Sequence, residues 1–290
     1  MFHNARIKGV LKIDGITSTN PIAVGDEVEI EVEDENETTA VISNILPRRN
    51  YINRQSPRLK YQQHIIAANL DQSLLLATLK NPRTSEGFMD RFLVVCEMYH
   101  VPAIIVFNKS DLFRKKEIEK FDEISAMYKN IGYQVYSISV QEDSGVKELK
   151  SILKDKTTLI SGHSGVGKSS LINALMPELD IKTQDLSGWS GKGQHTTTFA
   201  TMYDLPFGGQ IIDTPGIREL AITGLEKEEL SHYFPEMRRK LSGCQYNNCV
   251  HINEPNCAVK QAVVDGEITE DRYVSYVNIL DSLGDDIPKY

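Results

Sequence analysis

The feature that most restricts the fold is the segment Gly162–Ser169, which matches the pattern G-x-x-x-x-G-K-[ST]. An apolar run at 158–160 precedes it, and an apolar segment with helical spacing follows at 170–175. Strand, glycine-rich loop and helix in this order predict a phosphate-binding loop rather than a turn that binds nothing. The residues assigned to this loop are Gly162, His163, Ser164, Gly165, Val166, Gly167, Lys168 and Ser169.

Two side chains of the loop have distinct expected roles. Lys168 is expected to reach the β- and γ-phosphates of a nucleotide and to act in catalysis, and the Ser169 hydroxyl is expected to bind Mg²⁺. A second phosphate element, Asp213–Gly216, follows the apolar run 210–212. There, Asp213 can hold Mg²⁺ through water and the Gly216 N–H can meet the γ-phosphate.

Between these elements lies a segment rich in Gly, Ser and Thr, 188–198. It offers a threonine hydroxyl for Mg²⁺, and both Thr196 and Thr197 are candidates. Ile217 follows Gly216, at the position where Ras-type enzymes carry a glutamine that orients water. Isoleucine cannot polarise water, so we expect slow intrinsic hydrolysis that depends on another group. His195 is the catalytic candidate within the chain, and a solvated loop histidine is the alternative.

The choice of base is indicated by the motif Asn108-Lys109-Ser110-Asp111, which directly follows an apolar strand. Ligands bind at the carboxyl ends of such strands. An Asp carboxylate accepts hydrogen bonds from N1–H and the 2-amino group of guanine, whereas adenine has neither donor there. Asn108 can tie loops together and the Lys109 stem can cover the ring. The motif therefore predicts guanine nucleotides, with a surface turn as the alternative.

The order of the motifs is unusual. The base motif at 108–111 precedes the phosphate loop at 162–169, and Asp213–Gly216 comes last. A circular permutation can keep the strands and sites while the chain is cut and rejoined elsewhere, because termini lie at the surface.

A separate site is predicted near the C-terminus, where three of the four cysteines and one histidine lie close together. Three thiolates and an imidazole suit tetrahedral Zn²⁺ and leave no open position, which indicates one structural ion. Unrelated core cysteines are the alternative, and we expect Cys96 to be such a core residue. The predicted zinc ligands are Cys244, Cys249, His251 and Cys257.

The remaining pattern predicts three parts: a small β-rich unit with a basic linker (1–60), an α/β nucleotide domain (61–225) and a zinc-binding helical domain (226–290). We expect strands at 73–78, 101–107 and 133–138, and helices at 88–99, 117–130, 145–154, 226–241 and 269–283. The linker carries cations among aromatic residues, so it can bind RNA. The alternative is a basic linker that is solvated or paired to the acidic strand before it. Its cations are Arg48, Arg49, Arg54, Arg58 and Lys60.

Composition limits the partners. The net charge of −8 argues against bulk binding of nucleic acid. No apolar run approaches the roughly 20 residues that span a bilayer, and the N-terminus lacks the apolar core of a signal peptide. We therefore expect a cytoplasmic protein with no membrane partner.

Together these features resemble the circularly permuted, ribosome small-subunit-dependent GTPases of the RsgA/YjeQ family. The resemblance covers the whole chain, including the stretch 20–26 and the Gly193–Thr198 loop. It implies an N-terminal OB-like β-barrel, a permuted GTPase core, a C-terminal zinc domain and a role in late maturation of the small subunit. The family begins with about two more strands, so we expect an incomplete barrel here.

The resemblance places guanine contacts on Asn108, Lys109 and Asp111. It places phosphate contacts on Gly162–Ser170, which adds Ser170 to the loop, and zinc on the Cys/His quartet. It implies GTP and GDP, Mg²⁺ with GTP, the small subunit and its rRNA as partners, and we expect a monomer. The alternative function is an RNA- or ribosome-binding module with structural zinc in which nucleotide turnover is incidental.

Overall fold

The computed structural model describes residues 3–8, 20–34, 39–55, 63–179, 200–214, 222 and 224–283. At its centre lies a six-stranded sheet with the order β10-β11-β9-β6-β7-β8. Five of these strands run parallel and β10 is antiparallel to β11. The strands are β6 (Gln72–Ala77), β7 (Ala103–Phe107), β8 (Gln134–Ser137), β9 (Thr157–Ser161), β10 (Thr201–Asp204) and β11 (Gln210–Asp213).

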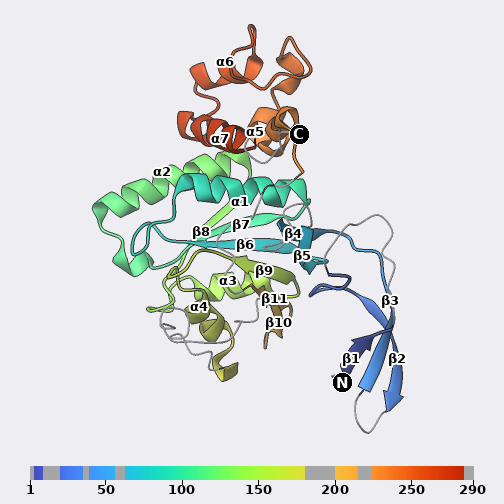
Figure 1. Ribbon diagram of the computed structural model, residues 1–290. Coiled ribbons are helices and arrows are strands. Elements are labelled where there is room, and N and C mark those ends of the chain that lie inside the picture. Colours follow the sequence, from blue (N-terminus) through green and yellow to red (C-terminus); the bar gives the residue numbers. More distant parts are fainter. Residues whose placement is uncertain are drawn as a thin grey trace, which may run out of the picture.

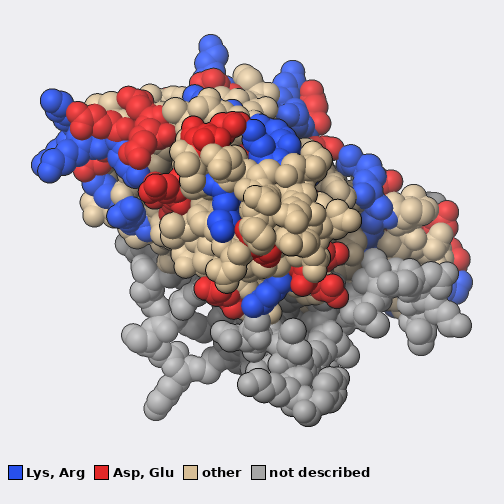
Figure 2. Space-filling view, turned by 90° about the horizontal axis from the view of Figure 1, so that it is seen from above, with Lys and Arg blue, Asp and Glu red and all other residues tan. Residues whose placement is uncertain are grey.

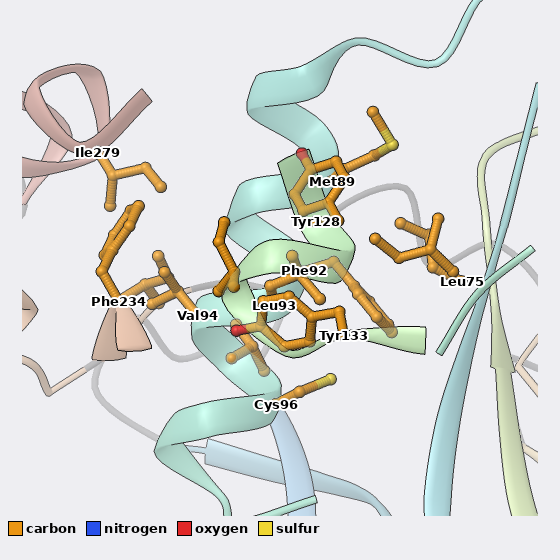
Figure 3. Packing of buried hydrophobic residues seen from close by; sticks show 14 of the residues in the cluster. Leu75, Met89, Phe92, Leu93, Val94, Cys96, Tyr128, Tyr133, Phe234 and Ile279 are labelled. Atoms are coloured by element: carbon orange, nitrogen blue, oxygen red, sulfur yellow. The ribbon is translucent and has the colours of Figure 1, made fainter. Parts of the chain in front are cut away.

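Helices cover both faces of this sheet (Figure 1). α1 (Glu86–Met98) and α2 (Lys115–Ile131) lie on one face, and α3 (Val146–Leu153) and α4 (Lys168–Leu175) lie on the other. Successive side chains of a strand point to opposite faces. Accordingly, Leu75 belongs to the core on the α1 side, whereas Leu74 and Leu76 belong to the core on the α4 side. Figure 3 shows the α1-side core, in which Met89, Phe92 and Leu93 lie among residues of the other elements.

The parallel strands bring several loops to one edge of the sheet. β6, β7, β9 and β11 all end at this edge, so the loops that begin at residues 78, 108, 162 and 214 lie together there. β9 is flanked by β6 and β11. The base motif and the two phosphate elements therefore meet, although they are far apart along the chain.

The described N-terminal strands form a separate sheet with the order β1-β3-β2, in which β1 is parallel to β3. They are β1 (Asn4–Ile7), β2 (Val28–Asp34) and β3 (Thr39–Ile45). Arg6 of β1 pairs with Glu33, and Lys8, which directly follows β1, pairs with Glu31, so both cations meet acids of β2. A closed OB-like barrel stays a prediction.

The basic linker contains a strand that the sequence analysis did not expect. β4 (Tyr51–Gln55) pairs antiparallel with β5 (Gln63–Ala68). The reason is the burial of Ile52, which is fully enclosed. Arg48 forms a buried ion pair with Asp26 at 2.6 Å, and Arg49 pairs with Asp71 at 3.1 Å.

Arg48 therefore follows the alternative in which the linker's cations pair with the acidic stretch before it, whereas Arg49 pairs with an acid that comes after the linker. Arg58 and Lys60 lie outside the described residues, as does the side chain of Arg54.

The C-terminal unit lies over α1 and α2 (Figure 1). It contains η3 (Lys227–Tyr233), α5 (Pro235–Arg238), η4 (Leu241–Gly243), α6 (Ala258–Val264) and α7 (Glu270–Ser282). The single helix expected at 226–241 is wrong, because Pro235 starts a new helix after a 3₁₀ turn. Two further 3₁₀ turns are η1 (Ser110–Leu112) and η2 (Pro177–Leu179).

Three further observations concern the core, the surface charge and the helices. Cys96 is buried in the core, as predicted. Seen from the side of the C-terminal unit, Lys/Arg and Asp/Glu residues are interspersed around a largely uncharged centre (Figure 2). Within the described residues, no helix combines the length and the apolar character needed to cross a bilayer.

Candidate nucleotide and metal sites

The phosphate loop joins β9 to α4, and its glycines occupy backbone conformations that other residues rarely adopt. Gly162 has a φ of 149° and Gly167 a φ of 100°. A Cβ atom on Gly162 would lie 2.5 Å from the carbonyl oxygen of Leu76, and one on Gly167 would lie 2.4 Å from Nδ2 of Asn108. The loop is therefore pressed against the ends of β6 and β7, and only glycine fits at these two positions.

Lys168 starts α4 and folds back over the loop. Its Nζ donates to the carbonyl oxygens of Gly162 and His163. Burial lowers the pKa of Lys168, and the nearby Asp213 carboxylate opposes that shift. The ammonium thus lies among oxygen acceptors, which are chemically similar to the oxygens of a phosphate.

Asp213 ends β11 beside this lysine. Burial raises the pKa of its carboxyl group, and Lys168 counteracts the effect. Its Oδ1 is buried and has no hydrogen-bond partner within the described part of the chain. A carboxylate oxygen of this kind at a phosphate site is a suitable ligand for Mg²⁺, directly or through water.

Asn108 is the residue that joins the base motif to the phosphate loop. Its Nδ2 donates to the carbonyl oxygen of Val166 at 2.9 Å, and its Oδ1 accepts from the N–H of Val140 at 3.3 Å. The side chain is buried. The amide thus both donates and accepts a hydrogen bond. Asn108 thereby links its own loop to the phosphate loop and to the loop that contains Val140.

Lys109 adopts a left-handed conformation with a φ of 64°. Its Nζ donates to the carbonyl oxygen of Gly165 at 2.8 Å and also to that of Asn81. The lysine stem therefore crosses from the base motif to the phosphate loop, where it can cover a bound ring. The next residue, Ser110, is anchored by its N–H, which donates to the carbonyl oxygen of Ile138 at 3.0 Å.

Asp111 is held by a contact that sequence reasoning missed. The hydroxyl of Ser139 donates to Oδ1 of Asp111 at 2.6 Å. Ser139 is fully buried, and its hydroxyl also accepts from the N–H of Glu142 at 3.1 Å.

The loop after β6 is a further neighbour of the phosphate loop that the sequence analysis did not assign. Oγ1 of Thr84 lies 2.7 Å from Nε2 of His163. A Cβ atom on Gly165 would lie 3.2 Å from Cδ of Pro82. The only sequence signal was position, because this loop follows a buried strand and so lies at the same edge of the sheet.

Of the other residues that the sequence assigns to the nucleotide site, some lie within the described part of the chain and some lie outside it. Ser164 and Ser170 are exposed, Ser169 is half-buried and Val166 is buried beneath the loop. His195, Thr196, Thr197 and Gly216 lie outside the described residues.

The Cys/His quartet gathers into one cluster. The ligand atoms of Cys244, Cys249, His251 and Cys257 all lie within 4.8 Å of one another. Nδ1 of His251 is 3.3 Å from Sγ of Cys257 and 3.7 Å from Sγ of Cys244. Nδ1 is therefore the imidazole nitrogen that is placed to bind a metal ion. Burial and the neighbouring thiols raise the pKa of Cys249 to about 12. A divalent cation would compensate the thiolates, and the donor set fits Zn²⁺.

The backbone of this cluster is held by side chains outside the quartet. The carboxylate of Glu254 accepts from the N–H groups of Val250 and Ile252 at 2.8 and 2.9 Å. From α7, the hydroxyl of Tyr273 donates to the carbonyl oxygen of His251 at 2.7 Å, and that of Tyr276 donates to Val250 at 2.9 Å. The metal-site loop is thus fixed to α7.

Known proteins are similar to this chain in sequence. The family model described as RsgA GTPase matches residues 45–223. A relative from Flavobacterium psychrophilum, named small ribosomal subunit biogenesis GTPase RsgA, is 49% identical over 98% of this chain and 87% of its own length. A relative of the same name from Bacteroides fragilis is 48% identical over 95% of this chain and 88% of its own length.

Solved structures agree in fold. YjeQ from Thermotoga maritima is 36% identical, with a TM-score of 0.78, and the match covers 97% of this chain and 90% of that one. YloQ, described as a circularly permuted GTPase, is 33% identical, with a TM-score of 0.73 over 98% of this chain and 88% of its own. The central unit is therefore a circularly permuted GTPase domain, and the chain belongs to the RsgA GTPase family.

Proposed function

We propose that this chain is a GTP-hydrolysing enzyme that acts in biogenesis of the small ribosomal subunit. The observation that carries the proposal is the bond from Asn108 to Val166, which joins a guanine motif to a phosphate loop in permuted order. The names of the relatives that align along nearly the whole chain support the biological role. The expected location is the cytoplasm, where small subunits mature.

Guanine recognition is assigned to the end of β7. Asp111 accepts hydrogen bonds from N1–H and the 2-amino group of the base, and the Ser139 hydroxyl orients its carboxylate. Lys109 covers the ring. Adenine lacks both donors and would leave the carboxylate unpaired, so the site rejects it.

The phosphates are assigned to the loop 162–170. Backbone N–H groups and the N-terminus of α4 meet the phosphate oxygens, and Lys168 exchanges its carbonyl partners for them. Mg²⁺ would be held by the Ser169 hydroxyl and by Asp213, and it supplies charge neutralisation at the β- and γ-phosphates. The roles of Thr196, Thr197 and Gly216 remain those predicted from sequence.

For hydrolysis, Lys168 stabilises negative charge that develops on the transferred phosphoryl group. His195 is the candidate that orients water, in place of the glutamine of Ras-type enzymes. The proposal expects slow turnover by the isolated protein, because Ile217 has no polar group to offer.

The C-terminal site is assigned to one structural zinc ion. Cys244, Cys249, Cys257 and Nδ1 of His251 supply four donors, which fills a tetrahedral shell and leaves no position for a substrate. The ion would fix the loop that carries these four ligands.

We further propose the division into units 1–60, 61–225 and 226–290, a monomeric state, and contact with small-subunit rRNA. The pairing of Arg48 and Arg49 with acids leaves these two cations engaged within the protein. The RNA-binding alternative, in which turnover is incidental, therefore loses two of its assigned contacts.

The test is steady-state GTP turnover with and without purified small subunits, with large subunits as the control. The proposal expects slow turnover alone and a many-fold increase with small subunits only. Equal rates in all three conditions would contradict it. In addition, Lys168→Ala should abolish stimulated turnover; if that variant still supported subunit maturation in cells, nucleotide turnover would be incidental.

A further inference from the structure

α1 lies between one face of the central sheet and the C-terminal unit (Figure 1). It begins after Ser85, whose hydroxyl accepts from the N–H of Phe88 at 3.3 Å and caps the helix. On one side the helix packs on β6, and on the other it packs against α7 and η3. A shift of α1 must therefore displace one neighbour or both, since packed interiors do not deform continuously.

The start of α1 is fixed to the phosphate loop by Thr84. The Thr84 hydroxyl accepts from the N–H of Thr78 at 3.0 Å and lies 2.7 Å from Nε2 of His163. Nδ1 of His163 lies 3.2 Å from the carbonyl oxygen of Ser164, which only accepts. Nδ1 therefore carries a proton, and in the neutral ring Nε2 accepts the Thr84 hydroxyl proton. Thr84 is buried, and the Phe88 ring meets the His163 ring edge-on at 5.6 Å between centroids.

Further along the same helix, Asp90 is fixed to α7. Oδ1 of Asp90 accepts from Nη1 of Arg272 and from the Tyr128 hydroxyl at 2.6 Å. Arg272 also donates through Nε to Glu236 at 2.7 Å, and its guanidinium lies 4.5 Å from the centroid of the Phe234 ring. Asp90 and Arg272 are each about 1% exposed.

A buried ion pair of this kind contributes little to net stability, because desolvation offsets its attraction, but it does select one arrangement of the groups. α7 carries Arg272 directly before Tyr273, which holds the carbonyl of the metal ligand His251. A continuous set of contacts thus runs from the phosphate loop through α1 to the zinc-site loop. Of these side chains, His163 belongs to the phosphate loop, whereas Thr84, Asp90 and Arg272 are assigned neither to the nucleotide nor to zinc.

We propose that α1 couples nucleotide binding at the phosphate loop to the position of the C-terminal unit, through the Thr84–His163 contact at its start and the Asp90–Arg272 pair in its middle. The proposal rests on the nucleotide site assigned above. Thr84 and Asp90 are positioning residues, because neither touches the nucleotide. Coupling is reciprocal, so a partner that binds the C-terminal unit would change nucleotide affinity by the same factor.

The test is amide hydrogen exchange of α7 in the full-length, zinc-loaded protein, with and without saturating GDP. The variants are Thr84→Val, which keeps shape but loses the hydroxyl, and Asp90→Asn, which loses the charge. Two substitutions serve as matched controls. Thr158→Val changes a buried threonine at the amino end of β9, away from the nucleotide loops, and Asp71→Asn changes the aspartate that pairs with Arg49. Calorimetry confirms that each variant is saturated with GDP, and Thr84→Ser serves as a rescue because it restores the hydroxyl.

We expect GDP to change α7 exchange several-fold in the wild type, in both controls and in Thr84→Ser, and to leave it unchanged in Thr84→Val and Asp90→Asn. A wild type that binds GDP with no response in α7 would overturn the coupling and leave the proposed function intact. A full response of α7 to GDP in Thr84→Val would also overturn the coupling. Because Thr84 lies outside the buried charge cluster, this variant keeps the test possible if Asp90→Asn does not fold. A protein that binds no guanine nucleotide would overturn both proposals.

Discussion

Nδ2 of Asn108 lies 2.9 Å from the carbonyl oxygen of Val166, although the two residues are 58 positions apart in the chain. The bond fixes the base motif to the phosphate loop. The spacing between the base motif and the phosphate loop is therefore held by a buried side-chain amide and does not depend on the order of these segments in the chain. This explains how the site can keep its shape in a permuted chain, because the contact depends on the sheet and not on which segment comes first.

The first prediction concerns the choice of base. Asp111→Asn should weaken GTP binding by about 1.5–3 kcal/mol, since hydrogen bonds to a charged group are lost. The same change should improve binding of xanthosine triphosphate, because the amide can donate where the carboxylate only accepted. Calorimetric titration measures both. Asp122→Asn, on the exposed face of α2, is the control, and an unchanged preference in Asp111→Asn would refute the guanine assignment.

A second prediction tests the hydroxyl that supports this carboxylate. Ser139→Ala removes the donor 2.6 Å from Asp111 and should weaken GDP binding by about 0.5–1.5 kcal/mol. The effect should vanish in the Asp111→Asn background, because the two residues act through one contact. Ser151→Ala, which lies on the exposed side of α3, should leave affinity unchanged. Additive losses in the double variant would show that Ser139 acts independently of Asp111.

The metal site gives a third prediction. Glu254→Gln weakens the two hydrogen bonds from Val250 and Ile252 that shape the ligand loop. Loss of such supporting contacts typically lowers metal affinity about 10–100-fold. Competition with a chromophoric chelator gives the zinc affinity, and Glu228→Gln, exposed on η3, serves as the control. Equal zinc affinities in the wild type and Glu254→Gln would mean that the loop holds its shape without this carboxylate.

Removal of zinc is a fourth test, with a structural readout. Tyr273 and Tyr276 donate to the carbonyls of His251 and Val250, so α7 and the ligand loop share contacts. Chelation should lower the thermal midpoint of the C-terminal unit and increase hydrogen exchange of α6 and the ligand loop, whereas the central sheet should exchange as before. Unchanged exchange after complete removal of the metal would contradict a structural role for the ion.

Much of the central domain could be predicted because its signals are local. The buried strands at 72–77 and 103–107 contain continuous apolar runs, at 74–77 and 103–107, and the phosphate loop matches a fixed pattern. Their positions at strand ends, together with the rule that ligands bind at the carboxyl edge of a parallel sheet, also predicted that the motifs meet. The zinc cluster was predicted from the spacing of four residues alone.

The remaining features depend on tertiary contacts. β4 lies in a basic segment, and only the burial of Ile52 against the domain makes it a strand. Thr84 and Ser139 are ordinary hydroxyl residues whose partners lie 79 and 28 positions away, so no local pattern marks them. Pro235 marks the start of a new helix, but the charged segment on both sides of it has a helical pattern and predicts one continuous helix.

The central claim is that the permuted site recognises guanine through Asp111 and binds the phosphates through the loop that contains Lys168. Its most direct test is a calorimetric titration of the wild-type protein, with Mg²⁺, against GDP and ADP in parallel. We predict stoichiometric binding of GDP and an affinity for ADP lower by at least about two orders of magnitude, since ADP leaves the buried carboxylate unpaired. ADP binding as tight as that of GDP would contradict the account.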